Sequence, residues 1–402
     1  RELFDCLSGM WCCPLGHAHP KIVEAFTRQA QTLDYSPAFQ VGNPVTFKLA
    51  ERIADLAPAG LDHVFFANSG SEAVDTALKI ALAYHRVRGE ASRFRMIGRE
   101  RAYNGVGFGG ISVGGMAANR KAFATAMLPG VDHLPHTWNL SQMAFSRGQP
   151  TWGLHLADEL ERIVALHDAS TIAAVIVEPV QGSTGVLVPP VGYLERLREI
   201  CTRHGILLIF DEVITGFGRL GANFGAQRFG VVPDMIAFAK GVTNGAIPLG
   251  GVVVRHDIYE NFMKPQAPEY AVELFHGYTY SGHPIAAAVG LATLDIYEQE
   301  GMFQRARELE PVFEAALHTL KGEPGVVDVR NFGLAAGVDL EAFDGQPGRR
   351  AFKVFEHGFA HDQLFRFTSD TIAMGPPFIS TTAEIERMIE QLRTAIRAVR
   401  PD

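Results

Sequence analysis

The first two thirds of the chain alternate short apolar runs with amphipathic stretches. Strand-sized apolar runs fall at residues 63–67, 172–177, 206–210 and 234–239, and a polar side chain follows each of them. A helical pattern over residues 72–87 comes soon after the first run. Buried strands that alternate with helices are typical of an α/β domain built on a mostly parallel sheet.

The final third of the chain has a different pattern, which begins after Pro284. Long helices are predicted over residues 285–300 and 303–320, and residues 326–340 alternate like an antiparallel pair of strands. Thr381 or Thr382 caps a last helix. One stripe of that helix carries its apolar residues, which are Ile385, Met388, Ile389, Leu392 and Ile396.

This change of pattern predicts two domains in one chain. We expect a large α/β domain over residues 40–282. A smaller α+β lobe is expected to combine residues 1–39 with residues 283–402. The length of 402 residues suits such a division.

Composition narrows the class of protein. The net charge is -8, whereas binding nucleic acid needs concentrated Lys and Arg, so no nucleic-acid partner is expected. No apolar run approaches the ~20 residues that cross a bilayer, so no membrane span is expected. The 4 cysteines are too few for a disulfide scaffold, and a cytoplasmic location is expected. Because the first residue is Arg1 rather than Met, we expect further residues ahead of it.

Ser69, Gly70 and Ser71 stand between a predicted strand and a long helix. The free N–H groups at the start of a helix, together with its dipole, attract a phosphate. A helix cap without a ligand is an equally good interpretation of this segment by itself, since Ser is a favoured cap residue.

Two charged residues follow apolar strands. Asp211 comes after residues 206–210 and would point to the same side as Val213, which suits a cationic heterocycle nitrogen with Val213 on its ring. Lys240 comes after residues 234–239, and a desolvated lysine becomes a nucleophile that forms Schiff bases. Taken singly, a salt bridge or cap at Asp211 and an ordinary lysine at position 240 are the more common cases.

Two other motifs would indicate a dinucleotide or a metal site, but their sequence context does not support either one. Residues 216–221 (GFGRLG) match a dinucleotide-binding fingerprint, but residues 222–233 lack helical periodicity, so a glycine-rich turn is expected. His133 and His136 lie in a Pro-bearing stretch without helical spacing, and no metal site is predicted.

A phosphate cradle, a carboxylate for a pyridinium nitrogen and a Schiff-base lysine together form the protein side of pyridoxal phosphate chemistry. The sequence also resembles the class III (fold type I) aminotransferases at residues 68–73 (NSGSEA), 209–219 (IFDEVITGFGR) and 239–241 (AKG). It is most similar to the β-alanine, or ω-amino acid, pyruvate group of that family. Further matching segments are 7–11 (LSGMW), 34–37 (DYSP), 277–284 (GYTYSGHP), 365–367 (FRF) and 375–377 (GPP).

This resemblance implies a fold type I architecture, a homodimer or larger homo-oligomer, and the cofactor pyridoxal 5'-phosphate. The residues that would bind it are Ser69, Gly70, Ser71, Tyr103, Glu178, Asp211, Val213, Lys240, Tyr278 and Thr279. Lys240 would attach the cofactor covalently and Asp211 would pair with its ring nitrogen, so both are the catalytic residues. Tyr103 and Val213 would cover the two ring faces, and Thr279 would come from the neighbouring subunit.

The resemblance also implies an amine donor and a keto acid acceptor as substrates. Trp11, Tyr103 and Arg366 would bind them, with Arg366 pairing with an α-carboxylate. Asn104 stands where many relatives carry His, so the local hydrogen bonding is expected to differ. The chain begins where the family's N-terminal helix has already ended, so a part of the pocket wall is expected ahead of Arg1.

Alternatives remain open at this point. A γ-aminobutyrate or other amine aminotransferase, an aminomutase or a decarboxylase of the same family would use the same cofactor residues. A nicotinamide-dependent oxidoreductase and a non-catalytic binding protein are the rivals outside it, although Lys240 and Asp211 argue against the latter.

Overall fold

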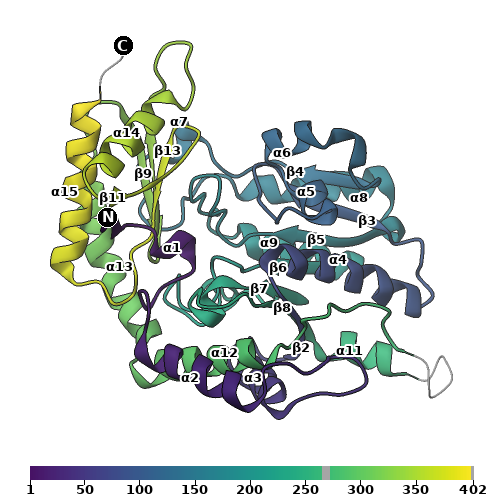
Figure 1. Cartoon of the computed structure of the whole chain (residues 1–402). Helices are drawn as coiled ribbons and strands as arrows, with labels where there is room; N and C mark the ends of the chain where they lie inside the picture. The colour runs from purple at the N-terminus through teal and green to yellow at the C-terminus, as the bar shows by residue number, and fades with distance from the viewer. Residues whose placement is uncertain (265–271, 400–402) are drawn as a thin grey trace.

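The structure is a computed structural model and describes residues 1–264 and 272–399 of the chain. Its centre is a seven-stranded sheet with the spatial order β2-β8-β7-β6-β5-β3-β4, in which β8 alone runs antiparallel to its neighbours (Figure 1). These strands are β2 (Leu61–Ala67), β3 (Arg95–Arg99), β4 (Val131–Leu134), β5 (Ile172–Val177), β6 (Leu207–Asp211), β7 (Met235–Phe238) and β8 (Gly250–Arg255). The predicted mostly parallel sheet is therefore confirmed.

Fifteen α-helices lie in the described residues. They are α1 (Ser8–Trp11), α2 (Pro20–Thr32), α3 (Pro44–Leu56), α4 (Gly70–Val87), α5 (Phe108–Val113), α6 (Ala117–Ala122), α7 (Leu140–Met143), α8 (Glu159–His167), α9 (Tyr193–His204), α10 (Gly225–Phe229), α11 (His256–Met263), α12 (Pro284–Gln299), α13 (Met302–His318), α14 (Arg349–Ala360) and α15 (Thr382–Ala398). Short 3-10 turns are η1 (Ala124–Ala126), η2 (Leu154–Asp158), η3 (Ala169–Thr171) and η4 (Lys240–Thr243). No helix among these residues has both the length and the apolar character that crossing a membrane requires.

Alternate residues of the central strands face two different apolar clusters. Ile176 and Ile209 pack with α4 on one face of the sheet, whereas Val175 and Phe210 face the larger cluster, which includes α3 and α9. This burial on both sides explains why the central strands read as continuous apolar runs. Strand β5 coincides with the predicted run and is buried along its whole length.

A second sheet of four strands lies in the C-terminal part of the chain, in the order β12-β13-β10-β9. Its strands are β9 (Val326–Phe332), β10 (Ala335–Leu340), β12 (Arg366–Thr368) and β13 (Thr371–Met374). Strands β9 and β10 form the predicted antiparallel pair. Thr381 caps α15 in a reciprocal box with Glu384, and the predicted apolar stripe of that helix is buried.

The N-terminal segment joins this C-terminal part. Strand β1 (Phe4–Asp5) pairs in parallel with β11 (Gln363–Leu364). Figure 1 shows the purple N-terminal segment and the yellow helix α15 on the same side of the molecule. This arrangement supports the proposed small lobe of residues 1–39 and 283–402, whose boundaries stay a prediction.

Some element boundaries differ from those predicted. Helix α4 begins at Gly70 rather than at residue 72, because the Ser69 side chain accepts a hydrogen bond from the backbone N–H of Glu72 and so caps the helix. Asp211 is the last residue of β6 rather than the residue after it. Residues 216–221 form turns, but the short helix α10 (Gly225–Phe229) falls in a stretch predicted to be irregular. Five residues are too few to show a helical period.

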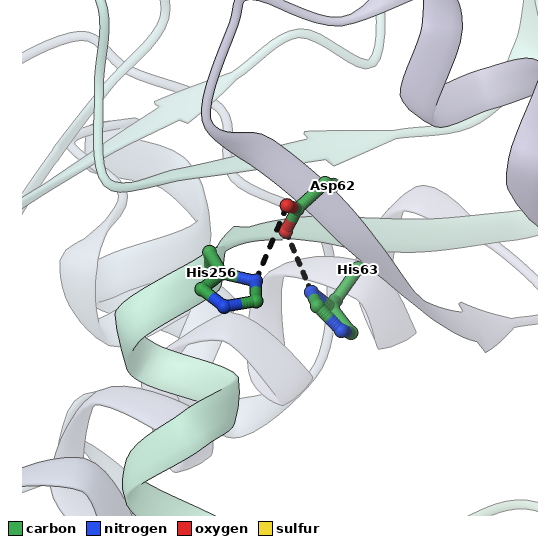
Figure 2. Close-up of side chains that lie close together, drawn as sticks. All are labelled: Asp62, His63 and His256. Carbon is green, nitrogen blue, oxygen red and sulfur yellow. Dashed lines mark hydrogen bonds and ion pairs between the residues drawn. The ribbon is translucent and has the colours of Figure 1, made fainter.

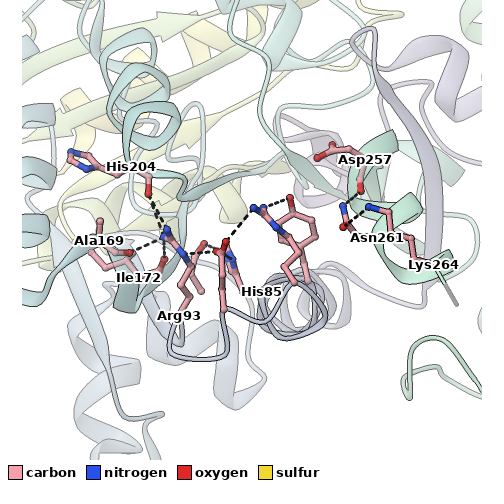
Figure 3. A network of polar contacts seen from close by, with 12 residues as sticks. His85, Arg93, Ala169, Ile172, His204, Asp257, Asn261 and Lys264 are labelled. Atoms are coloured by element: carbon pink, nitrogen blue, oxygen red, sulfur yellow. Dashed lines mark hydrogen bonds and ion pairs between the residues drawn. The ribbon is translucent and has the colours of Figure 1, made fainter. Parts of the chain in front are cut away.

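Polar contacts fix the end of the central sheet at which the parallel strands begin, opposite their carboxyl ends. Asp62 and His63 at the start of β2 meet His256 at the start of α11 (Figure 2). Farther along, Arg93 Nη1 donates hydrogen bonds to the backbone carbonyls of Ala169, Ile172 and His204 (Figure 3). One half-buried guanidinium thus holds together the segment before β3, the start of β5 and the end of α9.

Candidate active site

A cavity of about 110 Å³ opens at the carboxyl ends of the parallel strands. It is lined by Gly70, Ser71, Tyr103, Gly105, Glu178, Asp211, Val213, Ile214 and Lys240. These residues lie at the end of β6 or after β2, β3, β5, β6 and β7 in the chain, so the sheet brings them together where its parallel strands end. Ligands of open α/β sheets bind at this edge. Seven of the residues predicted from sequence therefore meet in one place.

The start of α4 forms an anion-binding cradle in this cavity. Within the described residues, no acceptor takes the backbone N–H groups of Gly70 and Ser71, which sit in the first turn of the helix. The helix dipole adds partial positive charge at the same point. A Cβ atom on Gly70 would lie 2.8 Å from Val213 Cγ1, so only glycine permits this close approach. The cradle suits a phosphate group.

Asp211 is a buried carboxylate that has neutral partners. Its Oδ2 accepts a hydrogen bond of 2.9 Å from Asn104 Nδ2, and its Oδ1 accepts one of 3.2 Å from the Val213 backbone N–H. No arginine or lysine forms an ion pair with it in the described part of the chain. Burial raises the pKa of Asp211, and the hydrogen bond from Asn104 works in the opposite direction. A cationic ring nitrogen would supply the missing counter-charge.

Glu178 is a second buried acid beside Asp211. Its carboxylate accepts hydrogen bonds from the backbone N–H groups of Tyr103 at 3.0 Å and Gly182 at 3.1 Å. Burial, followed by the nearby charge of Asp211, raises the pKa of Glu178 to about 8. The contact with Tyr103 fixes the segment that carries the aromatic ring into the cavity. Glu178 thus positions Tyr103 in addition to lining the cavity itself.

Lys240 follows β7 and opens the short turn η4. Its backbone has φ 50, a left-handed conformation that is uncommon for residues other than glycine and costs about 1 kcal/mol. Burial lowers the pKa of Lys240, and the charge of Arg366 adds to this effect, whereas Asp211 and Glu178 oppose it. A lowered pKa leaves more of the amine in the neutral, nucleophilic form.

Arg366 is the first residue of β12, in the C-terminal sheet. Its Nη1 contacts the Met10 sulfur, while its buried Nε has no hydrogen-bond partner among the described residues. The Arg366 charge acts on both Tyr103 and Lys240, and burial lowers the pKa of the guanidinium. An unpaired guanidinium at this place suits a carboxylate from a substrate.

The ring of Trp11 is 3% exposed and does not line this cavity. It packs against Gly375, and the Arg219 guanidinium lies 5.6 Å from the ring centre. In this chain, Trp11 thus supports the neighbouring wall, and its contact with substrate stays a prediction.

Comparison with known proteins identifies the family of this chain. The family model "Aminotransferase class-III" matches residues 1–396. The chain belongs to the class III aminotransferases. It is 57% identical to an ω-aminotransferase of Caulobacter vibrioides, over 99% of this chain and 90% of that protein. It is 51% identical to a β-alanine–pyruvate aminotransferase of Pseudomonas aeruginosa, over 99% of this chain and 89% of that protein.

Solved structures agree with this family. A crystal structure of a thermostable (S)-enantioselective ω-transaminase from Thermomicrobium roseum superimposes with a TM-score of 0.91 at 36% identity, over 98% of this chain and 88% of that chain. A pyridoxal-phosphate-bound amine transaminase from an uncultivated Pseudomonas species gives a TM-score of 0.89 at 35% identity, over 98% and 90% of the two chains. The predicted fold type I architecture and the cofactor pyridoxal phosphate are confirmed.

Three predicted cofactor residues of this aminotransferase, Ser69, Tyr278 and Thr279, do not line the cavity of their own chain. Ser69 instead caps α4 through its side chain. The Tyr278 hydroxyl is 3.1 Å from Thr76 Oγ1 on α4, so it is held behind the phosphate cradle. Thr279 is exposed, and its backbone carbonyl accepts a hydrogen bond from the Tyr35 hydroxyl. An exposed position is what a residue that serves a neighbouring subunit requires.

Asn104, Gly105 and Ile214 are functional neighbours that the sequence patterns did not assign to the site. Asn104 is 1% exposed, and its Nδ2 donates to Asp211 while its Oδ1 has no partner within the described part of the chain. Gly105 has φ 95, and a Cβ there would lie 2.7 Å from Ser71 Cα. The Asn-Gly pair at 104–105 is a turn signal that indicates such a backbone.

Proposed function

We propose that this aminotransferase moves the amino group of β-alanine, another ω-amino acid or a primary amine to pyruvate and releases L-alanine. The observation that carries this is the shared cavity of Lys240 and Asp211, with the unpaired Arg366 guanidinium beside it. The names of relatives more than 50% identical to the chain support the choice of donor and acceptor.

The residues of the cavity fit pyridoxal phosphate. The N–H groups of Gly70 and Ser71 would receive its phosphate, Asp211 would hold the proton on its ring nitrogen, and Lys240 Nζ would form its covalent attachment. Tyr103 and Val213 would enclose the ring between them. When bound, the cofactor supplies an aldehyde that takes up the amine and a ring that accepts an electron pair.

Lys240 would perform the proton transfers of both half-reactions. Released by the incoming amine, its neutral Nζ would accept the proton of the amine-bearing carbon and would then donate that proton to the former aldehyde carbon of the cofactor. Burial favours this role because it brings the pKa of Lys240 down towards the working pH. Asp211 would hold the proton on the ring nitrogen.

Arg366 would discriminate between the two kinds of substrate. Pyruvate and alanine carry a carboxylate next to the reacting carbon, and a guanidinium binds a carboxylate in a bidentate manner. A simple amine has no such group and would leave Arg366 with its contact to Met10. We therefore assign Arg366 to the keto acid half-reaction.

We further propose a homodimer whose active sites lie at the subunit interface. Large apolar side chains are exposed along residues 39–47 and 272–280, and Phe275 is 85% exposed. They surround a groove of about 280 Å³ that reaches Gly277, two residues before Thr279. Exposed apolar area of this kind marks a protein interface. A second copy of the chain would cover it and would receive Thr279 in its own phosphate cradle.

A mixing experiment tests this arrangement. Thr279→Asp should inactivate the partner's site, because its carboxylate would face the phosphate, while Lys240→Ala inactivates its own site. Unfolding and refolding the two inactive variants together should restore activity, since one site of each mixed dimer would be intact. Thr279→Ser is the control that should retain activity. A mixture that stays inactive while it forms dimers would contradict the shared site.

The absorbance of the purified protein tests the reaction itself. Bound cofactor gives a visible band that β-alanine should bleach and pyruvate should restore. γ-Aminobutyrate and a simple amine, run in the same way, rank the competing donors. If the native protein shows the band but no amine changes it, the proposed reaction is wrong. The Lys240→Ala variant should lack both the band and turnover.

Cysteine chemistry bears on the location of the protein. Cys6, Cys12, Cys13 and Cys201 are all free in the structure. Free thiols are typical of a reducing compartment. We propose the cytoplasm.

A further inference from the structure

Two histidines converge on one carboxylate at the sheet edge opposite the cavity. Asp62 Oδ1 is 2.6 Å from His63 Nδ1, and Asp62 Oδ2 is 3.3 Å from His256 Nδ1 (Figure 2). One ligand atom from each residue lies within 4.8 Å of the others. Asp62 and His63 belong to β2, whereas His256 is the first residue of α11.

Both imidazole rings are held by further contacts. His63 stacks on Tyr259 with 3.7 Å between ring centres and 16° between planes. His256 directs its other nitrogen, Nε2, towards Glu260 Oε1 at 4.0 Å. Tyr259 and Glu260 come three and four residues after His256, so they share its face of α11. Metal-binding histidines commonly have a carboxylate near the second ring nitrogen, which orients the ring.

Backbone contacts connect the two elements of the cluster, although the β2–β8 register shifts between Leu61 and His63, at Asp62. His63 pairs with Val254 in the β2–β8 ladder, and the His256 N–H donates a hydrogen bond of 3.0 Å to the Gly60 carbonyl. These contacts fix the distance between the start of β2 and the start of α11. Ligands on strands and helices are placed more accurately than ligands on loops.

We propose that Asp62, His63 and His256 bind a divalent transition-metal ion, with Zn²⁺ as the reference ion. Two imidazole nitrogens and one carboxylate oxygen favour such ions over Mg²⁺ and Ca²⁺, which prefer oxygen ligands. Two ligands of a tetrahedral ion at ~2.0–2.1 Å are about 3.3 Å apart. His256 Nδ1 and Asp62 Oδ2 already have this separation, whereas His63 Nδ1 faces the other oxygen, Oδ1, and has to shift towards Oδ2.

Each imidazole would coordinate through the lone pair of Nδ1 and would carry its N–H on Nε2, the nitrogen that in His256 faces Glu260. Asp62 and His256 have side chains that are 47% and 58% exposed, which leaves an open face for a water molecule as fourth ligand. Lys240 lies at the opposite end of the sheet, where the parallel strands end. The ion would therefore link β2 to α11 and would not take part in catalysis.

Cobalt and zinc titrations of the native, tag-free holoenzyme test the site. Co²⁺ in a tetrahedral nitrogen and oxygen site gives visible absorption that the cofactor band does not cover. We expect one Co²⁺ per chain, displaced by Zn²⁺, and a thermal midpoint that rises with Zn²⁺ concentration. His63→Gln and His256→Gln should each weaken binding by at least tenfold while turnover stays unchanged.

His204→Gln is the matched control, because His204 also pairs with a carboxylate, that of Glu161 at 2.9 Å, but has no second histidine. It should bind cobalt as the native enzyme does. If one of the glutamine variants does not fold, Asp62→Asn replaces it, since Asn keeps the size and one oxygen. No cobalt binding by the native protein, or equal binding by all variants, would overturn the proposal.

Discussion

Two buried aspartates lie at opposite ends of neighbouring strands in the central sheet, and the charges around them differ. Asp234, immediately before β7, is 1% exposed and accepts hydrogen bonds from Arg198 Nη1 at 2.8 Å, from Arg255 Nη1 and from the Leu208 N–H at 2.7 Å. Asp211, the last residue of β6, is 5% exposed, and its donors among the residues that the structure describes are Asn104 and Val213. Two guanidinium groups neutralise Asp234, whereas Asp211 has no cation bound to it.

This difference separates a structural carboxylate from a catalytic one. A buried charge costs free energy unless a partner compensates it. At Asp234 the protein provides that partner, and the result joins α9, β6 and β8. At Asp211 the protein leaves the charge uncompensated, so that the cofactor's ring nitrogen becomes its partner. The two sites therefore predict opposite consequences for the same substitution.

Asp211→Asn should have the largest effect, and it should be on rate. An amide cannot keep a proton on the ring nitrogen, so kcat should fall by at least ~10³-fold, or about 4 kcal/mol in activation free energy. The thermal midpoint of the cofactor-free protein should not fall, because a buried charge without a counter-charge has been removed. Steady-state kinetics and calorimetry measure the two quantities. A rate within about twofold of the native value would make Asp211 a structural residue.

Asp234→Asn should show the reverse behaviour. Removing the charge leaves Arg198 and Arg255 without their counter-charge, and breaking a buried ion pair costs about 3–5 kcal/mol of unfolding free energy. Turnover per folded molecule should stay unchanged. Urea unfolding followed by fluorescence gives the stability. If Asp234→Asn loses activity without losing stability, the distinction between the two aspartates fails.

Asn104→Ala tests the same comparison by removing one of the hydrogen-bond donors to Asp211. It removes the hydrogen bond that lowers the pKa of Asp211, so this pKa should rise and the acid limb of the kcat/KM profile should move to higher pH. A hydrogen bond to a charged group is worth about 1.5–3 kcal/mol, which sets the expected loss of rate. Asn104→His, which restores a donor, should recover part of the loss. An unchanged pH profile in Asn104→Ala would reduce Asn104 to a packing role.

Glu178→Gln should give the smallest effect, visible as a trend with pH. The pKa of Glu178 rises from an ordinary 4.5 to about 8 on folding, so between these values the native state binds a proton that the unfolded state has released. The cofactor-free native protein should therefore lose stability as the pH increases through this window. The Glu178→Gln variant should lose less stability over this pH range. The difference between its melting temperature and that of the native protein should therefore change with pH. Parallel curves from pH 5 to pH 8 would contradict the raised pKa.

Sequence patterns predicted the parts of the molecule that depend on local chemistry. The β5 run is apolar throughout because both of its faces are buried, and Asp211 and Lys240 were identifiable as charges at the ends of such runs. The Asn104 contact with Asp211 spans 107 residues, so no local pattern contains it. The burial of Trp11 against Gly375 and the meeting of His63 with His256 depend in the same way on tertiary structure.

The parallel pairing of β1 with β11 has a consequence for movement in the enzyme. It joins residues 4–5, which precede Trp11 in the chain, to residues 363–364, which precede Arg366. A displacement of this paired segment would move both side chains together, while Lys240 and Asp211 stay with the central sheet. A longer donor would then be accommodated by a shift of the backbone pair rather than by rearranging single side chains.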